Sequence, residues 1–286
     1  MAPPQSNFIR TTRIGCIEVT SLFDGWLSLD GGAMFGIVPK VLWEKKIPAD
    51  NLNRIKLALR PLLVRTPQHT LVVETGLGQA LTARQESMYG VQRGAGLDEQ
   101  VRAAGVDPSS VEHLLLTHLH WDHSGGACRK VDDHFVPTFA AARYWVNRRE
   151  WKVATKPDNL QRQSYVPESL TPLRGQLKFV PSDGKVVPGV RFESTGGHTE
   201  NHSVIWIEDG GEAGCFMGDI LETTAHAPLP WISAYDLCAG ESYRAREKLW
   251  PKLVERKATC FVYHDPVHAA CKLVQRDGKY DTEPIT

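Results

Sequence analysis

The order of the elements that the sequence predicts favours an α/β or α+β fold. Short apolar runs of strand length are followed by a helical segment, and this succession occurs twice along the chain. The chain has 286 residues, which is within the range of one large domain. We therefore expect a single domain over residues 1–286, with sheets at its centre and helices outside them.

The first half of the chain supplies strands and one clear helix. The predicted strands are residues 17–29, 57–65, 70–74 and 111–117. Residues 31–36 are rich in glycine and predict a flexible loop. Residues 98–104 predict a helix, because Gly105 can cap its end and Pro108 cannot continue it. This half therefore ends on a buried strand at residues 111–117.

The second half repeats the pattern after a stretch that is hard to interpret. Residues 129–185 carry scattered prolines, so we expect an irregular insertion there, with a helix over residues 140–154. The predicted strands are residues 185–187, 190–194, 202–207, 214–217, 259–263, 271–275 and 279–283. Residues 243–255 predict a helix, and Asp277-Gly278 predicts a hairpin turn.

A dense cluster of imidazoles and one carboxylate follows the strand at residues 111–117. His118, His120, Asp122 and His123 lie within six residues of one another. Imidazole is the commonest metal ligand in proteins, and a carboxylate adds a hard oxygen donor. A glycine turn comes next, so we expect these side chains on a loop at a strand end, not on a helix. The run predicts a metal site.

Three later strand ends carry further candidate ligands. His198 follows two glycines, Asp219 follows Gly218, and His264 ends an apolar run. A lone histidine or aspartate at such a position is more often structural. Because several strand ends in one chain share this design, we expect one site built from all of them.

These motifs resemble those of the metallo-β-lactamase superfamily, over residues 71–265. The resemblance implies an αββα sandwich of two mixed sheets with helices outside. It also implies the ligand sets: His118, His120 and His198 for one metal, Asp122, His123 and His264 for a second, and Asp219 bridging both. The family's upstream Val-Asp-Thr-Gly turn reads Val73-Glu74-Thr75-Gly76 here, so Glu74 replaces the aspartate.

A site of this kind predicts hydrolysis. We expect two divalent metals, with zinc preferred over iron, manganese or cobalt, since such ligands accept all four. Two metals lower the pKa of a bridging water, and the resulting hydroxide is the expected nucleophile. Asp122 is the candidate base, because a carboxylate ligand keeps a free oxygen, and Asp219 is the second candidate catalytic residue.

Residues 218–231 resemble a subgroup of quorum-quenching lactonases and methyl-parathion-type hydrolases. Those lactonases carry a tyrosine three residues after the bridging aspartate, where this chain has Glu222. His226 or Tyr235 are the candidate replacements for it. The expected pocket residues are Met34, Phe35, Tyr89, Glu222, His226, Trp231 and Tyr235.

The expected activity is hydrolysis of small lactones or esters. A phosphotriesterase that uses the same site is the first alternative. A non-catalytic, ligand-binding member of the fold is the second, because a fold alone does not prove activity.

The composition of the chain argues against some classes of binding partner. The 33 basic and 33 acidic side chains balance, which argues against a nucleic-acid or membrane surface as partner. The six cysteines form no close pair, and residues 1–7 lack the pattern of a secretion signal, so we expect a cytoplasmic protein. The apolar residues 33–38 are a candidate homodimer interface.

Overall fold

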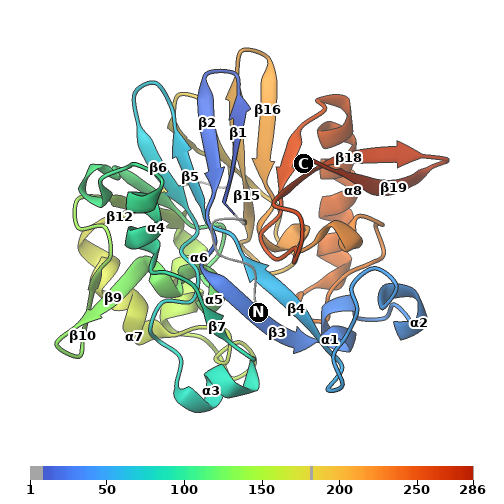
Figure 1. The fold of residues 1–286 in the computed structure, drawn as a ribbon, viewed down its shortest axis with the longest axis horizontal. Helices are drawn as coiled ribbons and strands as arrows, with labels where there is room; N and C mark the ends of the chain where they lie inside the picture. The colour runs from blue at the N-terminus through green and yellow to red at the C-terminus, as the bar shows by residue number, and fades with distance from the viewer. Residues whose placement is uncertain (1–8, 181–182, 286) are drawn as a thin grey trace.

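Two seven-stranded sheets face each other at the centre of the computed structural model, which describes residues 9–180 and 183–285 (Figure 1). The first sheet has the order β1-β2-β5-β6-β8-β11-β12, and the second runs from β13 to β19 in sequence order. The first sheet comprises β1 (Arg10–Ile14), β2 (Ile17–Ser21), β5 (Leu62–Arg65), β6 (Thr70–Val73), β8 (His113–Leu115), β11 (Arg143–Asn147) and β12 (Leu177–Val180). The second comprises β13 (Lys185–Val187), β14 (Val190–Ser194), β15 (Ser203–Asp209), β16 (Glu212–Phe216), β17 (Thr259–Phe261), β18 (Ala270–Arg276) and β19 (Lys279–Pro284).

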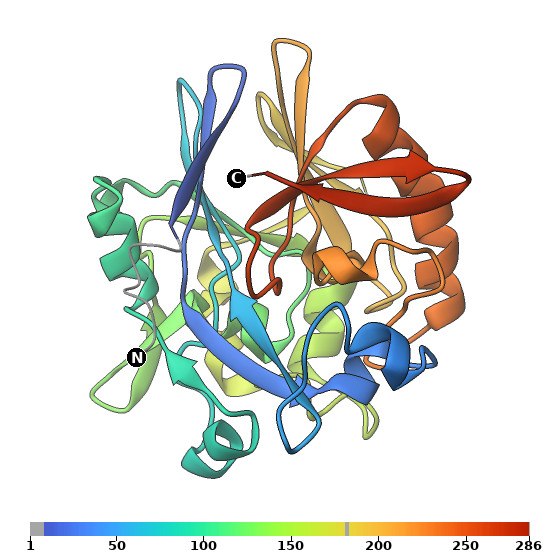
Figure 2. The same ribbon diagram turned by 45° about the vertical axis from the view of Figure 1, so that its right-hand side comes forward.

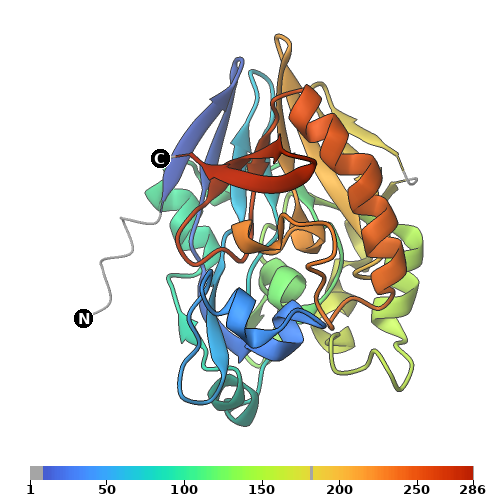
Figure 3. The ribbon, with the colours of Figure 1, turned by 90° about the vertical axis from the view of Figure 1, so that its right-hand side faces the viewer.

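Successive side chains of a strand point to opposite faces of the sheet, and this divides the hydrophobic core into layers. On β15, Ile205 and Ile207 point into the cluster shared by both sheets, whereas Val204 and Trp206 belong to the cluster under a long helix. Successive side chains of a strand point to opposite faces, so one strand supplies both clusters. Helix α8 (Ala239–Glu255) covers this outer face and is seen along its length in Figure 3.

The first sheet is covered on its outer face in the same way. Val72 and Leu114 pack there with Val101 of helix α4 (Leu97–Ala103) and Trp151 of helix α6 (Arg148–Thr155). Helices therefore lie outside both sheets, as Figure 2 shows from a second direction. The expected αββα sandwich is confirmed. The predicted helix at residues 98–104 and the hairpin at Asp277-Gly278 are also present.

The strand predicted over residues 17–29 is wrong as one element. It is two strands in different sheets: β2 in the first sheet, and β3 (Gly25–Asp30), which pairs with β4 (Arg54–Leu59) and β7 (Gln92–Arg93). The chain turns between them because Gly25 adopts a φ of 139°, a value that favours glycine. The strand predicted over residues 57–65 is divided in the same way, into β4 and β5.

The loop predicted at residues 31–36 is instead a short helix, α1 (Gly31–Phe35). The Asp30 side chain caps it by accepting a hydrogen bond from the Ala33 amide. Burial of Met34 and Phe35 then holds the turn in place. The capping residue lies just before the glycines, so glycine content alone misled the prediction.

The segment at residues 129–185 is not the irregular insertion that we expected. It contains the hairpin β9 (Cys128–Val131) and β10 (His134–Pro137), and also β11 and β12, which complete an edge of the first sheet. The helix predicted over residues 140–154 is wrong in its first half, where Tyr144 and Val146 alternate inward on β11. Only α6 is helical there, since its capping residue Asn147 marks the true start.

The remaining α-helices among the described residues are short. They are α2 (Lys40–Trp43), α3 (Ala83–Met88), α5 (Trp121–Ser124) and α7 (Pro167–Leu170). Within the described residues, no helix has the length and apolar character to cross a membrane. The expectation about a secretion signal concerns residues 1–7, which lie outside the described part of the chain.

Candidate metal centre

The histidine-rich run begins beyond the end of β8, as its position in the sequence predicts. His118 and His120 lie on the loop that follows the strand. Asp122 and His123, however, lie on the one-turn helix α5, so the expectation that no ligand candidate is helical is wrong for these two. The helical turn points both side chains back toward the loop, because side chains of a helix tilt toward its N-terminus.

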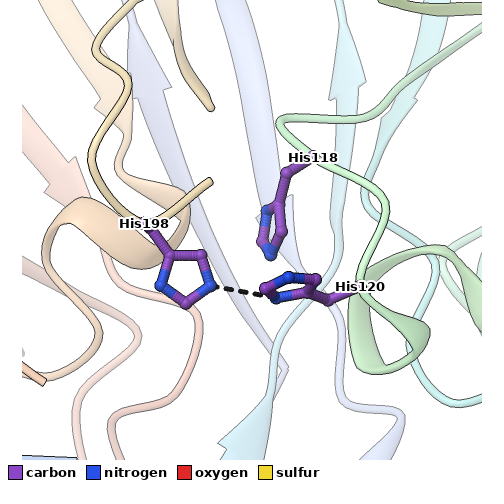
Figure 4. Close-up of side chains that lie close together, drawn as sticks. All are labelled: His118, His120 and His198. Carbon is purple, nitrogen blue, oxygen red and sulfur yellow. Dashed lines mark hydrogen bonds between the residues drawn. The ribbon is translucent and has the colours of Figure 1, made fainter. Parts of the chain in front are cut away.

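Three imidazoles form the first group, which we call triad one: His118, His120 and His198 (Figure 4). Figure 4 shows the rings converging from two separate loops. The Nε2 atom of His198 lies 3.0 Å from Nδ1 of His120. The three candidate ligand atoms lie within 4.8 Å of one another, which is close enough to share one cation.

Triad two comprises Asp122, His123 and His264. The Nε2 atoms of His123 and His264 lie 3.3 Å apart, and Oδ2 of Asp122 lies 3.8 Å from the former and 3.6 Å from the latter. His264 stands just beyond β17, as the sequence predicts.

Asp219 lies between the two triads and turns one oxygen to each. Its Oδ2 atom is 3.2 Å from Nε2 of His198 and 3.9 Å from that of His118. Its Oδ1 atom is 3.2 Å from Nε2 of His123 and 3.4 Å from that of His264. This is the arrangement that a carboxylate bridging two cations requires.

Two of the candidate donor atoms have no hydrogen-bond partner in the described part of the chain, which suits them to a metal ion. Within the described residues, Nε2 of His118 and Oδ1 of Asp219 are buried and accept no hydrogen bond. Buried polar atoms are rarely left in this state. Burial, with His123 next to His118 and His198 next to His120, holds the pKa of both rings well below the usual value. Neutral rings keep the lone pairs that metals bind.

In each triad, a carboxylate supports the outer nitrogen of one ring. Oδ1 of Asp236 lies 2.9 Å from Nδ1 of His198, and Oε2 of Glu74 lies 3.5 Å from Nδ1 of His123. Burial alone would lower the pKa of both rings, but nearby carboxylates outweigh it. They raise the pKa of His198 to about 9 and that of His123 well above its usual value. The hydrogen bond to Asp236 fixes the orientation of the His198 ring and makes its inner nitrogen a better ligand, whereas Glu74 acts on His123 through its charge.

Neutral groups support two of the other rings. Nδ1 of His118 lies 3.0 Å from Oγ1 of Thr117, and Nδ1 of His264 lies 3.1 Å from the carbonyl oxygen of Ala58. A carbonyl only accepts, so Nδ1 of His264 carries the proton and Nε2 is left free to face Asp219.

A glycine precedes each of two candidate ligands for a steric reason. Gly197 has a φ of 88°, and a Cβ atom there would lie 2.3 Å from Oγ of Ser242. Gly218 has a φ of 50°, and a Cβ atom there would lie 2.5 Å from Nε2 of His202. Both positions combine left-handed backbone with a close approach, so a side chain would displace His198 or Asp219.

His202 is a structural neighbour of the site. Its Nε2 atom accepts a hydrogen bond from the Asp219 amide at 3.1 Å, and its Nδ1 atom lies 2.7 Å from Oγ1 of Thr195. Burial and His198 lower its pKa to about 3, so the ring is neutral and can accept. It fixes the backbone of the shared carboxylate.

Glu150, which no sequence pattern singled out, joins the two loops that carry triad one. The carboxylate is fully buried; Oε1 accepts from the Leu119 amide at 3.1 Å and from the Tyr165 hydroxyl at 3.1 Å. Oε2 accepts from the Thr199 hydroxyl at 2.9 Å. Leu119 lies between two candidate ligands and Thr199 follows a third. Whether a carboxylate is buried is known only once the fold is known, so the sequence could not reveal this residue.

A cavity of about 150 Å³ opens above the two triads. Of the expected pocket residues, Met34, Tyr89, Glu222 and Tyr235 line it. Six residues that the sequence did not single out also line it: Leu29, Leu57, Trp121, Gln163, Ser164 and Ser233. The walls are thus mainly apolar and the floor carries the candidate ligands.

Phe35, His226 and Trp231 do not line this cavity, so their prediction as pocket residues is wrong. Phe35 stacks on His226 with ring centroids 4.4 Å apart and meets Trp231 edge-on at 5.8 Å. His226 is fully buried, and its Nε2 atom lies 2.9 Å from the Met34 carbonyl oxygen. These rings form a layer behind the pocket, where burial of apolar surface is their function.

Glu222 is on the cavity floor, and its carboxyl group is unusual. Its Oε2 atom lies 3.4 Å from the Arg246 guanidinium, which is itself fully buried. Burial and repulsion by Asp236 raise the pKa of Glu222 to about 8, against the opposing influence of Arg246. The position that holds a tyrosine in the lactonases therefore holds a buried carboxyl group here.

Sequence comparisons agree with this geometry. The family model of the metallo-beta-lactamase superfamily matches residues 61–276. An N-acyl homoserine lactonase of Bacillus thuringiensis is 25% identical over 160 residues, which cover 51% of this chain and 56% of that protein. A probable metallo-hydrolase of Mycobacterium bovis is 27% identical over 174 residues, 56% of each chain. The chain spans about half the length of the curated relatives it matches.

Solved structures share the fold over nearly the whole chain. A probable metal-dependent hydrolase from Staphylococcus aureus is 30% identical, with a TM-score of 0.89 over 96% of this chain and all of that one. A dizinc quorum-quenching lactonase in complex with its product has a TM-score of 0.82 over 97% of each chain, at 21% identity. With the family match over most of its length and this fold, the chain belongs to the metallo-β-lactamase superfamily.

Proposed function

We propose that this protein is a metal-dependent hydrolase of small lactones or esters that uses two divalent metals. One observation carries the proposal: the two oxygens of Asp219 face two separate triads on the floor of a cavity. The triads offer nitrogen and oxygen donors that lie within 4.8 Å of one another. Zinc is the preferred metal, since imidazole and carboxylate suit it and one structural neighbour is described as a dizinc lactonase.

The chain's own residues divide the work around these metals. When bound, two divalent cations lower the pKa of a water that they share, which makes hydroxide available near neutral pH. Asp122 presents one oxygen to triad two, so its other oxygen is free to orient that water or take its proton. Asp219 would hold both cations, one through each oxygen, and the outer partners of the rings keep the candidate ligands in place.

The cavity supports a small, largely uncharged substrate. Leu29, Met34, Leu57 and the stacked pair Tyr89 and Trp121 present apolar surface above the polar floor. An ester or lactone ring fits this division, since its carbonyl meets the floor and its carbon atoms meet the walls. The relatives described as lactonases favour the same substrate class.

The test is one sample measured in two ways. Metal content per chain is determined together with turnover of p-nitrophenyl acetate, a γ-lactone series and paraoxon. We expect two metals per chain and lactone or ester turnover that a chelator abolishes and added zinc restores. Faster turnover of paraoxon than of esters would select the phosphotriesterase. Two metals without any turnover, but a ligand-induced melting shift, would select the non-catalytic alternative.

Two further predictions concern the protein as a whole. Each of its six cysteines, all within the described residues, is free, which fits the proposed cytoplasmic location. Ile37 and Val41 are exposed near residues 33–38, which fits the proposed homodimer. Light scattering on the purified protein tests the dimer, and a monomeric mass would contradict it.

A further inference from the structure

Asp265 follows the candidate ligand His264, and both oxygens of its side chain accept hydrogen bonds. The residue is 2% exposed. Its Oδ1 atom accepts from the amides of Val267 at 2.8 Å and His268 at 2.7 Å, which fixes the turn after His264. Its Oδ2 atom accepts from the amide of Thr224 at 2.9 Å and from the hydroxyl of the same residue at 2.6 Å. One carboxylate therefore binds its own turn with one oxygen and a separate loop with the other.

The loop that Asp265 reaches forms part of the cavity above the triads. Thr224 comes two residues after Glu222, which lines the cavity. It also comes two residues before His226, whose Nε2 atom lies 2.9 Å from the carbonyl oxygen of Met34, another cavity residue. The anchor at Thr224 thus lies between two residues that shape the cavity, one directly and one through Met34.

Two anchors hold this loop from different sides. Arg246 of helix α8 donates from Nε to the carbonyl oxygen of Ile220 at 2.9 Å. On the other side, the Asp265 side chain acts together with the His264 amide, which donates to the carbonyl oxygen of Glu222 at 3.0 Å. Arg246 fixes the loop relative to the helix, whereas Asp265 fixes it relative to His264. The distance between the loop and triad two therefore depends on the Asp265 side.

The junction around Asp265 is stable although it buries a carboxylate. Four donors face the side chain, and hydrogen bonds to an ionised acceptor are roughly twice as strong as neutral ones. Arg60, which is also buried, donates from Nε to the Asp265 carbonyl oxygen at 3.1 Å and brings a positive charge to the same place. A buried charge is tolerated under these conditions. Removing one partner leaves buried groups unsatisfied, so each change at this junction should have a measurable effect.

We propose that Asp265 is a positioning residue: through Thr224, it fixes the distance between the loop of residues 220–227 and triad two, and so sets the width of the cavity. This assignment rests on the proposed hydrolase function. The ring of His264 itself is held by Ala58, whose carbonyl oxygen lies 3.1 Å from Nδ1. Loss of the Asp265 link should therefore leave the metals in place and displace the substrate instead.

The Asp265→Asn variant breaks the link and keeps the turn. The amide oxygen of asparagine can accept from Val267 and His268, whereas its NH₂ group would meet the Thr224 amide, which also donates. We expect two metals per chain, as in the wild type, and a kcat/KM for γ-butyrolactone that is lowered by about 10- to 100-fold, because a misplacement of about 1 Å can cost 100-fold. Calorimetric binding of the ring-opened product, 4-hydroxybutyrate, should weaken without any turnover.

Thr224 provides a matched pair of variants. Thr224→Val loses the hydroxyl bond to Asp265 and should lower kcat/KM by about 10-fold, whereas Thr224→Ser keeps the bond and should match the wild type. In the double variant of Asp265→Asn and Thr224→Val, the losses should not add, because both changes remove one link. Asp107→Asn is the control: this exposed aspartate accepts from the Ser109 amide at 2.9 Å and does not line the cavity.

The outcomes separate this assignment from the hydrolase proposal. Wild-type kcat/KM and product binding in a folded, metal-loaded Asp265→Asn protein would overturn the assignment. Loss of one metal in that variant would also overturn it, since Asp265 would then support the ligand and not the cavity. If Asp265→Asn does not fold, the two Thr224 variants decide.

Hydrogen exchange decides the assignment without any turnover. If the wild type hydrolyses none of the tested compounds, the hydrolase proposal fails, and exchange at residues 220–227 is compared between the two Thr224 variants. Faster exchange in Thr224→Val than in Thr224→Ser would support the role of Asp265, and equal exchange would overturn it.

Discussion

The two triads around Asp219 obtain their support from different parts of the chain. In triad one, His198 is supported by Asp236, which is 38 residues further along the chain. In triad two, His123 is supported by Glu74, which directly follows β6, the strand next to β8 in the sheet. The first partner comes from a distant loop and the second from an adjacent strand end.

This difference teaches how the site is held together. Glu74 also accepts a hydrogen bond from the Thr117 amide at 2.8 Å, so triad two is fixed by the sheet itself. Triad one depends on side chains that join separate loops, Asp236 and Glu150. We therefore expect triad one to be the more sensitive to changes outside the ligands, and the predictions below test the two sides against each other.

The largest effect is expected where the triads meet. Asp219→Ala removes a carboxylate that contacts histidines of both triads, so we expect both triads to lose metal binding. Loss of a partner outside the ligands costs 10- to 100-fold in other metal sites, so we expect more than about a 100-fold loss in kcat/KM and loss of both metals. Elemental analysis with lactone assays measures this. A variant that retains two metals would refute the bridging assignment.

The next test separates the triads. His198→Ala and His264→Ala each remove one candidate ligand, and we expect each variant to retain about one metal per chain because the other triad is intact. Metal content after dialysis against a fixed zinc concentration measures this. His134→Ala, an exposed histidine on β10, is the matched control and should retain two metals. Loss of both metals in either variant would mean that the triads bind as one unit.

A smaller effect is expected from the outer partners. Asp236→Asn should weaken metal binding at triad one, and Glu74→Gln at triad two, by about 10- to 100-fold each. Competition with a coloured chelator gives both affinities. Because Glu74 is also tied to the strand end, we expect the weaker effect there. Equal or reversed effects would remove the distinction between loop support and sheet support.

The smallest effect concerns stability away from both triads. Burial, reinforced by Arg246, lowers the pKa of His226 from 6.5 to about 4. Between these two pKa values, the unfolded chain binds a proton at His226 and the folded protein does not. The contribution of His226 to stability is therefore fully present above pH 6.5 and is lost as the pH falls toward 4.

Urea unfolding of the metal-free protein at two pH values measures this contribution. Between pH 7 and pH 5, we expect His226 to cost about 2 kcal/mol of unfolding free energy. His226→Gln keeps a donor for the Met34 carbonyl and should remove that part of the pH dependence. An unchanged slope in the variant would contradict the burial argument. The difference between the slopes of the wild type and the variant isolates His226, because the histidines of the triads contribute to both slopes.

The sequence alone predicted the seven candidate ligands and the succession of strands and helices along the chain. All seven candidate ligands follow apolar runs or glycines, and such positions lie at the ends of strands where a sheet exposes its edge. Glu74 was also visible, because its turn stands at a strand end. This information is local, because each of these positions is recognised from the residues next to it in the chain.

The tertiary structure decided what depends on distant segments meeting. Asp236 and Glu150 have ordinary sequence surroundings, and only the packing of separate loops brings them to His198 and Leu119. In the same way, Phe35 and Trp231 could not be assigned to the pocket or to the layer behind it, because pockets and cores use the same residues. The direction in which each side chain points, and not its residue type, decides between these roles. A sequence does not contain that direction.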